Sequence, residues 1–116
     1  MREGSGTLAY APALSSLDER TVERLEACDC ALVDGTFWAG DELIALGIAR
    51  RDAAAMGHVP LAGPDGSLAT LSALASRTIL VHVNNTNPIL LDDSPERAQV
   101  EAGGIEVSYD GMEFEL

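Results

Sequence analysis

Short apolar runs alternate along this chain with segments that carry helix signals. Residues 30–33 and 78–83 are nearly continuous apolar runs, and such runs are typical of strands buried on both faces of a sheet. Residues 7–10 predict another short strand. Near the end of the chain, residues 105–109 and 112–116 flank an Asp-Gly turn and predict two short strands or a hairpin. Together these runs predict one small sheet.

Helix start and stop signals fill the gaps between these strands. Ser16-x-x-Glu19 has the form of a capping box, and the stripe that follows predicts a helix ending near Cys28. Three further helices are predicted: one within residues 41–49, one capped by Ser67, and one that begins at Ser94-Pro95 and is closed by Gly103. Residues 56–66 are rich in glycine and proline and predict a loop.

The order of these elements predicts an α/β fold, with helices packed against a buried sheet. The 116 residues suffice for one small domain, which we expect to span residues 1–116. In such sheets, ligands collect beyond the carboxyl ends of the strands. Asp34 ends one of the two most apolar runs, and His82, Asn84 and Asn85 end the other. A functional site is therefore expected at this edge.

Charge narrows the classes of partner. The chain has 19 acidic and 7 basic residues, a net charge of −12, and every basic residue is arginine. A surface this acidic repels phosphate backbones and anionic lipids, which argues against nucleic-acid and membrane partners. No apolar run approaches the roughly 18 residues of a membrane span, and residues 1–6 lack the apolar core of a signal peptide. We therefore expect a cytoplasmic protein.

Familiar catalytic motifs are absent from the sequence. There is no Gly-x-Ser-x-Gly nucleophile elbow, no Gly-x-Gly-x-x-Gly fingerprint and no Walker loop. Cys28 and Cys30 form Cys-Asp-Cys rather than Cys-x-x-Cys and cannot complete a four-ligand zinc site alone, so we interpret them as packed thiols. One aspartate and two histidines are left as candidates for chemistry.

Asp34, His58 and His82 each have a structural and a functional interpretation. Asp34 precedes Gly35, so its carboxylate either accepts backbone hydrogen bonds in a turn or binds a ligand. His82 lies inside an apolar run, where it is either a satisfied core residue or a ligand of a transition metal. His58 stands in the loop 56–60 and is either exposed or placed over a site.

Asn84 and Asn85 open a dense group of amide and hydroxyl side chains at residues 84–87. Such side chains commonly satisfy the backbone of their own loop. Because they follow the end of a strand, they are also our candidates for substrate contacts. From the residues alone, Asp34, His58 and His82 are too few to define a metal site.

Several segments resemble the family of coenzyme PQQ synthesis protein B. The resemblance rests on Leu32-Val33-Asp34-Gly35-Thr36-Phe37-Trp38, Met56-Gly57-His58-Val59-Pro60, His82-Val83-Asn84-Asn85-Thr86-Asn87-Pro88, Asp93-Ser94-Pro95-Glu96-Arg97 and the terminal Asp110-Gly111-Met112. These segments follow in order from about residue 7 to the end of the chain. The run Asn-Asn-Thr-Asn-Pro and the terminal Asp-Gly-Met are the most specific of them.

The resemblance implies a metallo-β-lactamase-like fold, an αββα sandwich, and a role in biosynthesis of the redox cofactor pyrroloquinoline quinone (PQQ). It implies iron-dependent hydroxylation of the tyrosine ring in a precursor derived from a glutamate–tyrosine peptide, with zinc as the other candidate metal. By their place in the chain, Asp34 and His82 match the metal-binding aspartate and histidine of that superfamily. His58 matches a Gly-His loop residue that lines the site and assists proton transfer.

The sequence departs from the family pattern in one respect. The His-x-His-x-Asp-His cluster, which lies in the first half of that fold, has no counterpart here. The resemblance therefore implies the C-terminal half of the sandwich, with a complementary N-terminal chain as a candidate partner. An oxygen-activating iron site needs about three protein ligands, and Asp34 and His82 supply two, with His58 as the other candidate. We therefore expect the isolated chain to bind iron weakly and not to turn over. Half a sandwich would also expose the sheet face that meets its partner sheet.

Two other functions stay open for the same residues. The chain is either a carrier for PQQ or its precursor, with the polar loops holding an acidic ligand, or a hydrolase that uses metal-bound hydroxide. The sequence leaves open whether this chain alone is an enzyme.

Overall fold

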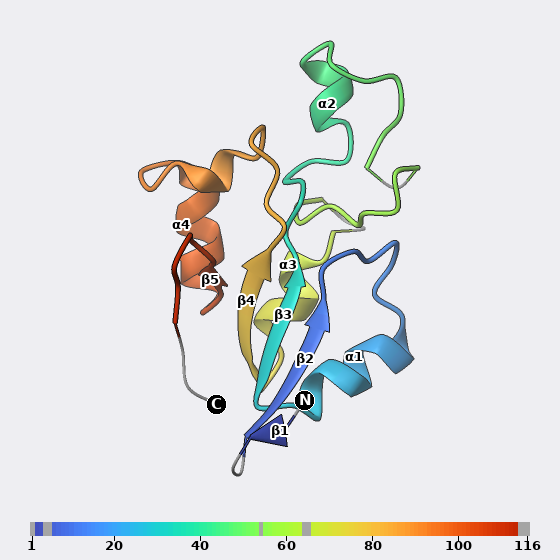
Figure 1. Ribbon diagram of the computed structural model, residues 1–116. Helices are drawn as coiled ribbons and strands as arrows, with labels where there is room; N and C mark the ends of the chain where they lie inside the picture. The colour runs from blue at the N-terminus through green and yellow to red at the C-terminus, as the bar shows by residue number, and fades with distance from the viewer. Residues whose placement is uncertain (1, 4–5, 54, 64–65, 114–116) are drawn as a thin grey trace.

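A single five-stranded sheet with the strand order β1-β2-β3-β4-β5 organises the chain (Figure 1). The computed structural model describes residues 2–3, 6–53, 55–63 and 66–113. The strands are β1 (Arg2–Glu3), β2 (Gly6–Ala11), β3 (Cys30–Asp34), β4 (Arg77–Val81) and β5 (Glu106–Val107). From β2 to β5 every neighbouring pair is parallel, so these strands present their carboxyl ends at one edge.

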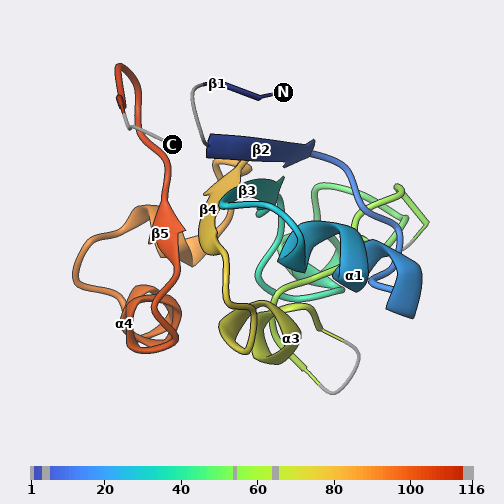
Figure 2. The same cartoon turned by 90° about the horizontal axis from the view of Figure 1, so that it is seen from below.

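Helices lie against one face of this sheet (Figure 2). They are α1 (Glu19–Glu26), α3 (Leu68–Ser72) and α4 (Pro95–Ala102), while the short α2 (Glu42–Ala45) lies beyond the carboxyl edge (Figure 1). The 3-10 turn η1 (Pro88–Leu90) leads from β4 towards α4. This arrangement and the parallel sheet confirm the expected α/β class.

One row of residues across the sheet explains the position of the core. Ala11, Val33, Leu80 and Val107 are paired in register across β2 to β5, and the last three belong to the buried core cluster. Leu25, Leu71 and Val100, one from each covering helix, pack into the same cluster. The continuous apolar character of β3 and β4 follows from this burial.

Three helix predictions need correction. The helix α1 begins at Glu19 because Asp18, rather than Ser16, accepts the hydrogen bond from the Thr21 amide at 2.8 Å. Within residues 41–49 only Glu42–Ala45 is α-helical. Ser67 precedes α3 but makes no capping bond, and its buried hydroxyl has no hydrogen-bond partner within the described chain.

The helix signals around α4 are confirmed. Ser94 accepts a hydrogen bond from the Arg97 amide at 3.0 Å, Pro95 occupies the first helical position, and Gly103 follows the last one. Within the described residues, no helix is both long enough and apolar enough to cross a membrane.

Two strand predictions extend too far. The strand β4 ends at Val81, and His82 leaves it with φ of +57°, so the imidazole does not lie inside a strand. Of residues 105–109 only Glu106–Val107 is a strand, and it pairs parallel to β4 rather than in a hairpin. The turn at Asp110-Gly111 is present, residues 112–113 are not a strand, and residues 114–116 lie outside the described part.

Candidate metal centre

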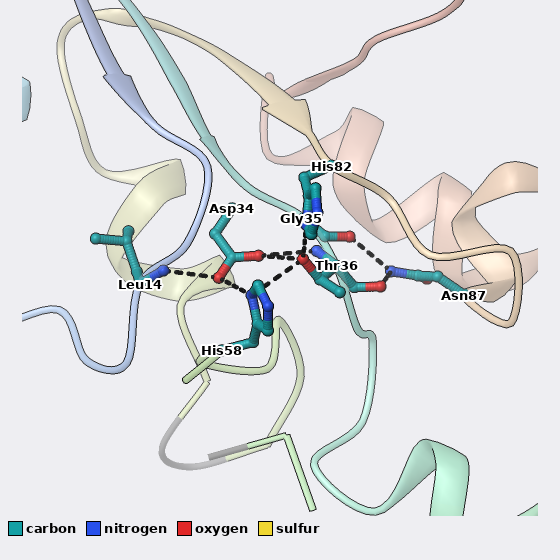
Figure 3. Close-up of polar contacts among 7 residues, drawn as sticks. All are labelled: Leu14, Asp34, Gly35, Thr36, His58, His82 and Asn87. Carbon is teal, nitrogen blue, oxygen red and sulfur yellow. Dashed lines mark hydrogen bonds and ion pairs between the residues drawn. The ribbon is translucent and has the colours of Figure 1, made fainter. Parts of the chain in front are cut away.

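Asp34, His58 and His82 converge at the carboxyl edge of the sheet (Figure 3). Asp34 is the last residue of β3, His82 directly follows β4, and His58 comes from the loop between α2 and α3. Each offers one ligand atom, and these atoms all lie within 4.8 Å of one another. The expectation that the carboxylate at 34 and the imidazole at 82 lie side by side is thus met, with His58 as a third member.

Asp34 is fully buried, and its carboxylate accepts four hydrogen bonds. Oδ1 accepts from the Thr36 amide at 3.0 Å and from the Thr36 hydroxyl at 2.7 Å. Oδ2 accepts from the Leu14 amide at 2.8 Å and lies 2.8 Å from Nδ1 of His58. Since a carboxylate has about four lone-pair positions, these partners use its full capacity. The structural interpretation of Asp34 therefore holds in this structure, and a ligand would have to replace one of these four partners.

Gly35 allows the chain to turn beside β4 immediately after Asp34. A Cβ atom at this position would lie 2.8 Å from Cβ of Leu80, which is closer than packed carbon atoms approach. The amide of Gly35 donates to the Val81 carbonyl at 2.9 Å, and the Asn87 side chain donates to the Gly35 carbonyl at 3.0 Å. These contacts fix the turn after β3 against the segment after β4.

His58 is held over Asp34 by its loop. Gly57 has φ of +83°, a left-handed conformation that glycine adopts without strain. The His58 amide donates to the Ala53 carbonyl at 2.9 Å, and the ring of Phe37 meets the imidazole edge-on with centroids 5.9 Å apart. The side chain of His58 is only 14% exposed, so it is placed over the site rather than in solvent.

His82 completes the group from the opposite side. Its ring stacks on that of His58 with centroids 5.4 Å apart and planes 18° apart, and its Nδ1 lies 2.8 Å from the Thr36 hydroxyl. Its left-handed backbone is costly for a residue with a Cβ atom, and such conformations are concentrated at functional sites. His82 is exposed, so its ring can reach a ligand from solvent.

The two asparagines expected to contact substrate lie in the loop after His82. The Asn84 side chain donates to the Thr86 hydroxyl at 2.6 Å, and Thr86 donates to the buried carboxylate of Glu42 at 2.6 Å. Asn85 is exposed. Within the described structure, neither asparagine side chain forms a hydrogen bond with Asp34, His58 or His82.

Three residues with a clear part in this site were missed from the sequence. Thr36 contacts Asp34 and both imidazoles, Asn87 ties the turn at Gly35, and Glu42 accepts from the Trp38 amide at 2.9 Å. The position of Thr36, two residues after a strand-ending aspartate, was the available signal, because such a side chain can bond back to the aspartate. Asn87 belongs to the polar group at residues 84–87 noted from the sequence, whereas no local pattern pointed to Glu42.

Among the described residues, the two cysteines are not part of this cluster. Cys30 is buried in β3, and desolvation raises the pKa of its thiol above the ordinary value, which disfavours the thiolate that binds metals. Cys28 precedes the strand, is half-buried, and its thiol donates to the Arg24 carbonyl at 3.4 Å. Both are free, as expected of packed thiols.

A cavity of about 630 Å³ opens beside His82. It lies between the ends of β4 and β5, η1 and α4, and it is lined by His82, Val83, Leu90, Asp92, Arg97, Val107, Ser108, Tyr109 and Asp110. Its volume falls in the range of small-molecule sites. The cluster thus borders a space in which a small ligand could be held.

The chemistry of the donor set fits a metal ion. One carboxylate and two imidazoles form the combination that non-haem iron uses, and zinc accepts the same ligands. The residues come from three separate segments and are fixed by the hydrogen bonds described above. A parallel α/β sheet with such a cluster at its carboxyl edge is the arrangement expected of a metal-binding α/β protein.

The chain belongs to the β-lactamase superfamily: the family model "Beta-lactamase superfamily domain" matches residues 1–83. Over 116 residues it is 50% identical to the coenzyme PQQ synthesis protein B of Cupriavidus taiwanensis. It is 51% identical over 111 residues to the protein of the same name from Azotobacter vinelandii. These alignments cover 99% and 96% of this chain but only 38% and 37% of the relatives, so the chain spans less than two fifths of their length.

A solved structure agrees with the sequence relatives. The fold matches the crystal structure of Zn(2+)-bound PqqB from Methylobacterium extorquens with a TM-score of 0.93 at 39% identity, covering 99% of this chain and 42% of that one. The resemblance to coenzyme PQQ synthesis protein B and the superfamily fold expected from the sequence are therefore confirmed. The chain is related to proteins of PQQ biosynthesis, and one of them is named as zinc-bound.

Proposed function

We propose that this chain supplies Asp34, His58 and His82 to the metal centre of a PQQ-biosynthesis oxygenase. The observation that carries the proposal is their convergence within 4.8 Å at the carboxyl edge of the sheet. The similarity to coenzyme PQQ synthesis protein B and to a zinc-bound relative supports it. Iron is the proposed metal and zinc the alternative, and the reaction is placed in the cytoplasm.

Each of the three residues has a proposed part. Asp34 and His82 are ligands, and an ion on Oδ2 of Asp34 would take the place of the present contact with His58. His58 then serves as a further ligand or moves a proton at Nδ1. When bound, iron would supply oxygen activation for hydroxylation of a tyrosine ring. Buried Phe37 beside His58 limits water on one side of the cluster.

The cavity beside His82 is the proposed place for a small PQQ precursor. Arg97 is the only positively charged residue in its described lining. Its Nη1 donates to the Ile89 carbonyl at 2.9 Å and lies 3.4 Å from Oδ1 of Asp92. A guanidinium in this place can pair with a carboxylate ligand. Asn84 and Asn85 directly follow two cavity-lining residues and are proposed to contact the same precursor.

The isolated chain is expected to bind iron weakly and to show no turnover, because the His-x-His-x-Asp-His cluster of the superfamily has no counterpart in it. A complementary N-terminal chain is the proposed partner that completes the sandwich. Domain 1–116 is accordingly proposed to be the C-terminal half of the fold. Metal binding can therefore be tested directly on this chain, and the test of activity is a separate one.

Anaerobic titration of the chain with Fe²⁺ tests the proposal. His82→Ala should lower iron affinity by more than about tenfold, since even the outer partners of ligands contribute that much. Asp93→Asn, an exposed carboxylate elsewhere, serves as the matched control and should leave affinity unchanged. Equal affinity of wild type and His82→Ala would overturn the metal centre. An assay for hydroxylated tyrosine should give no product with the chain alone, and tight binding with turnover would refute the incomplete-site proposal.

A further inference from the structure

Thr36 occupies the centre of the hydrogen-bond network between the two histidines (Figure 3). Its hydroxyl lies 2.7 Å from Oδ1 of Asp34, 2.8 Å from Nδ1 of His82 and 3.2 Å from Nδ1 of His58. Thr36 is buried, with 4% of its surface exposed, so these contacts are shielded from bulk solvent. A hydroxyl has one proton to donate and two lone pairs with which to accept.

The direction of each bond follows from these capacities. The Asp34 carboxylate can only accept, and four donors surround it, so the single hydroxyl proton of Thr36 points to Asp34. The oxygen of Thr36 must then accept from His82, which places a proton on Nδ1 of that ring. In a neutral imidazole the other nitrogen, Nε2, is left with a free lone pair.

The same accounting applies to His58. Its Nδ1 lies 2.8 Å from Oδ2 of Asp34, which also only accepts, so this nitrogen carries a proton as well. Both rings, when neutral, therefore keep a free lone pair on Nε2. Asp34 sets this state for His58 directly, and for His82 it does so through Thr36.

We infer that Thr36 is a positioning residue that holds His82 in the Nδ1–H tautomer and so reserves Nε2 for a ligand. The value of this state for metal binding rests on the proposed function, whereas the tautomer is a property of the chain alone. Residues that orient metal-binding histidines in this way commonly contribute tenfold to hundredfold in affinity.

Nitrogen-15 NMR of the metal-free chain tests the inference directly. The chain has only two histidines, so each ring can be assigned by comparison with a single variant. In its neutral form, His82 should show a protonated Nδ1 and an unprotonated Nε2. A protonated Nε2 in the wild type would overturn the inference without any mutant.

Thr36→Val removes the hydroxyl at nearly constant shape and should shift His82 towards the Nε2–H form. Thr36→Ser should restore the Nδ1–H form, and Thr70→Val, a half-buried threonine of α3 outside the cluster, should leave it unchanged. An unshifted ring in Thr36→Val, or a failure of Thr36→Ser to restore it, would refute the role.

Zinc titration of the same variants separates this inference from the proposed function. Thr36→Val should lower zinc affinity about tenfold relative to wild type and Thr36→Ser. If the wild type binds no zinc while the tautomers behave as expected, the metal centre is wrong and the role of Thr36 in setting the tautomer stands. If zinc binds but the tautomer is independent of Thr36, the inference fails and the metal centre stands.

Discussion

Asp34 and Glu106 are carboxylates of the same parallel sheet in very different surroundings. Asp34, at the end of β3, is fully buried and accepts hydrogen bonds from three protein segments. Glu106, at the start of β5, is 40% exposed and pairs with Arg77 at the start of β4 through bonds of 2.5 and 2.7 Å. Burial removes water as a partner, so Asp34 depends wholly on the protein for its hydrogen bonds. Water can replace much of the hydrogen bonding that Arg77 provides to Glu106.

This difference predicts the largest effect for removal of Asp34. Asp34→Ala leaves the amides of Leu14 and Thr36, together with His58, without their acceptor. We expect a loss of about 3–5 kcal/mol in the free energy of unfolding, as for other broken buried networks. Urea denaturation measures it. Asp93→Ala, at an exposed site, should change stability by less than about 0.5 kcal/mol. A loss below about 1 kcal/mol for Asp34→Ala would show that the network is not a main source of stability.

The turn beside Asp34 gives the second prediction. Gly35→Ala places a methyl group 2.8 Å from Cβ of Leu80 and should destabilise the fold by about 1–3 kcal/mol through overpacking. Gly40→Ala is the matched control, because the nearest atom to its new methyl, on Pro60, lies 3.8 Å away. Comparison of the two urea midpoints measures the effect. Equal stability of both variants would mean that β3 and β4 separate easily at this edge.

The same contrast explains how much could be predicted from the sequence. The buried strand at residues 30–33 and the cap of α4 at Ser94-Pro95 were correctly predicted, because each depends on neighbours in the chain. The position of Asp34 at the carboxyl edge followed from strand order. Sequence signals were therefore sufficient to predict an element where its interaction partners lie nearby in the chain.

The remaining features depend on contacts between distant segments. His82 leaves β4 although its apolar neighbours favour a longer strand, and its ring instead meets Thr36, which lies 46 residues away. The pairing of β5 with β4 likewise connects residues far apart in the chain. The spacing of residues along one segment does not reveal these distant partners.

The backbone of His82 gives the third prediction. Both His82→Gly and His82→Ala remove the imidazole, so any difference between them reports the left-handed φ of +57°. The glycine variant should be the more stable by about 1 kcal/mol, because left-handed backbone costs roughly that much with a Cβ atom. Gly47→Ala, at φ of +72° with no atom near the new methyl, calibrates the cost and should destabilise by a similar amount. Thermal unfolding checks both, and equal stability of the two His82 variants would remove the case for strain.

The ion pair at the opposite end of β4 should show the smallest effect. The hydrogen bond from Arg77 holds the pKa of Glu106 below its usual value. A lowered pKa in the folded state adds stability that is present above the unfolded pKa, about 4.3, and is lost as the pH falls through the folded pKa. Because both side chains are about 40% exposed, Glu106→Gln should lose less than about 1 kcal/mol at neutral pH.

The pH and salt dependence of that loss distinguish this pair from Asp34. The difference in unfolding free energy between wild type and Glu106→Gln should shrink as the pH falls below about 4 and when salt screens the charges. Glu23→Gln, at an exposed position of α1, is the control for removal of one negative charge from a chain of net charge −12. A difference that persisted unchanged to about pH 3 would mean that Glu106 acts through packing rather than charge. The loss in Asp34→Ala should withstand salt, because a buried network is screened little by ions.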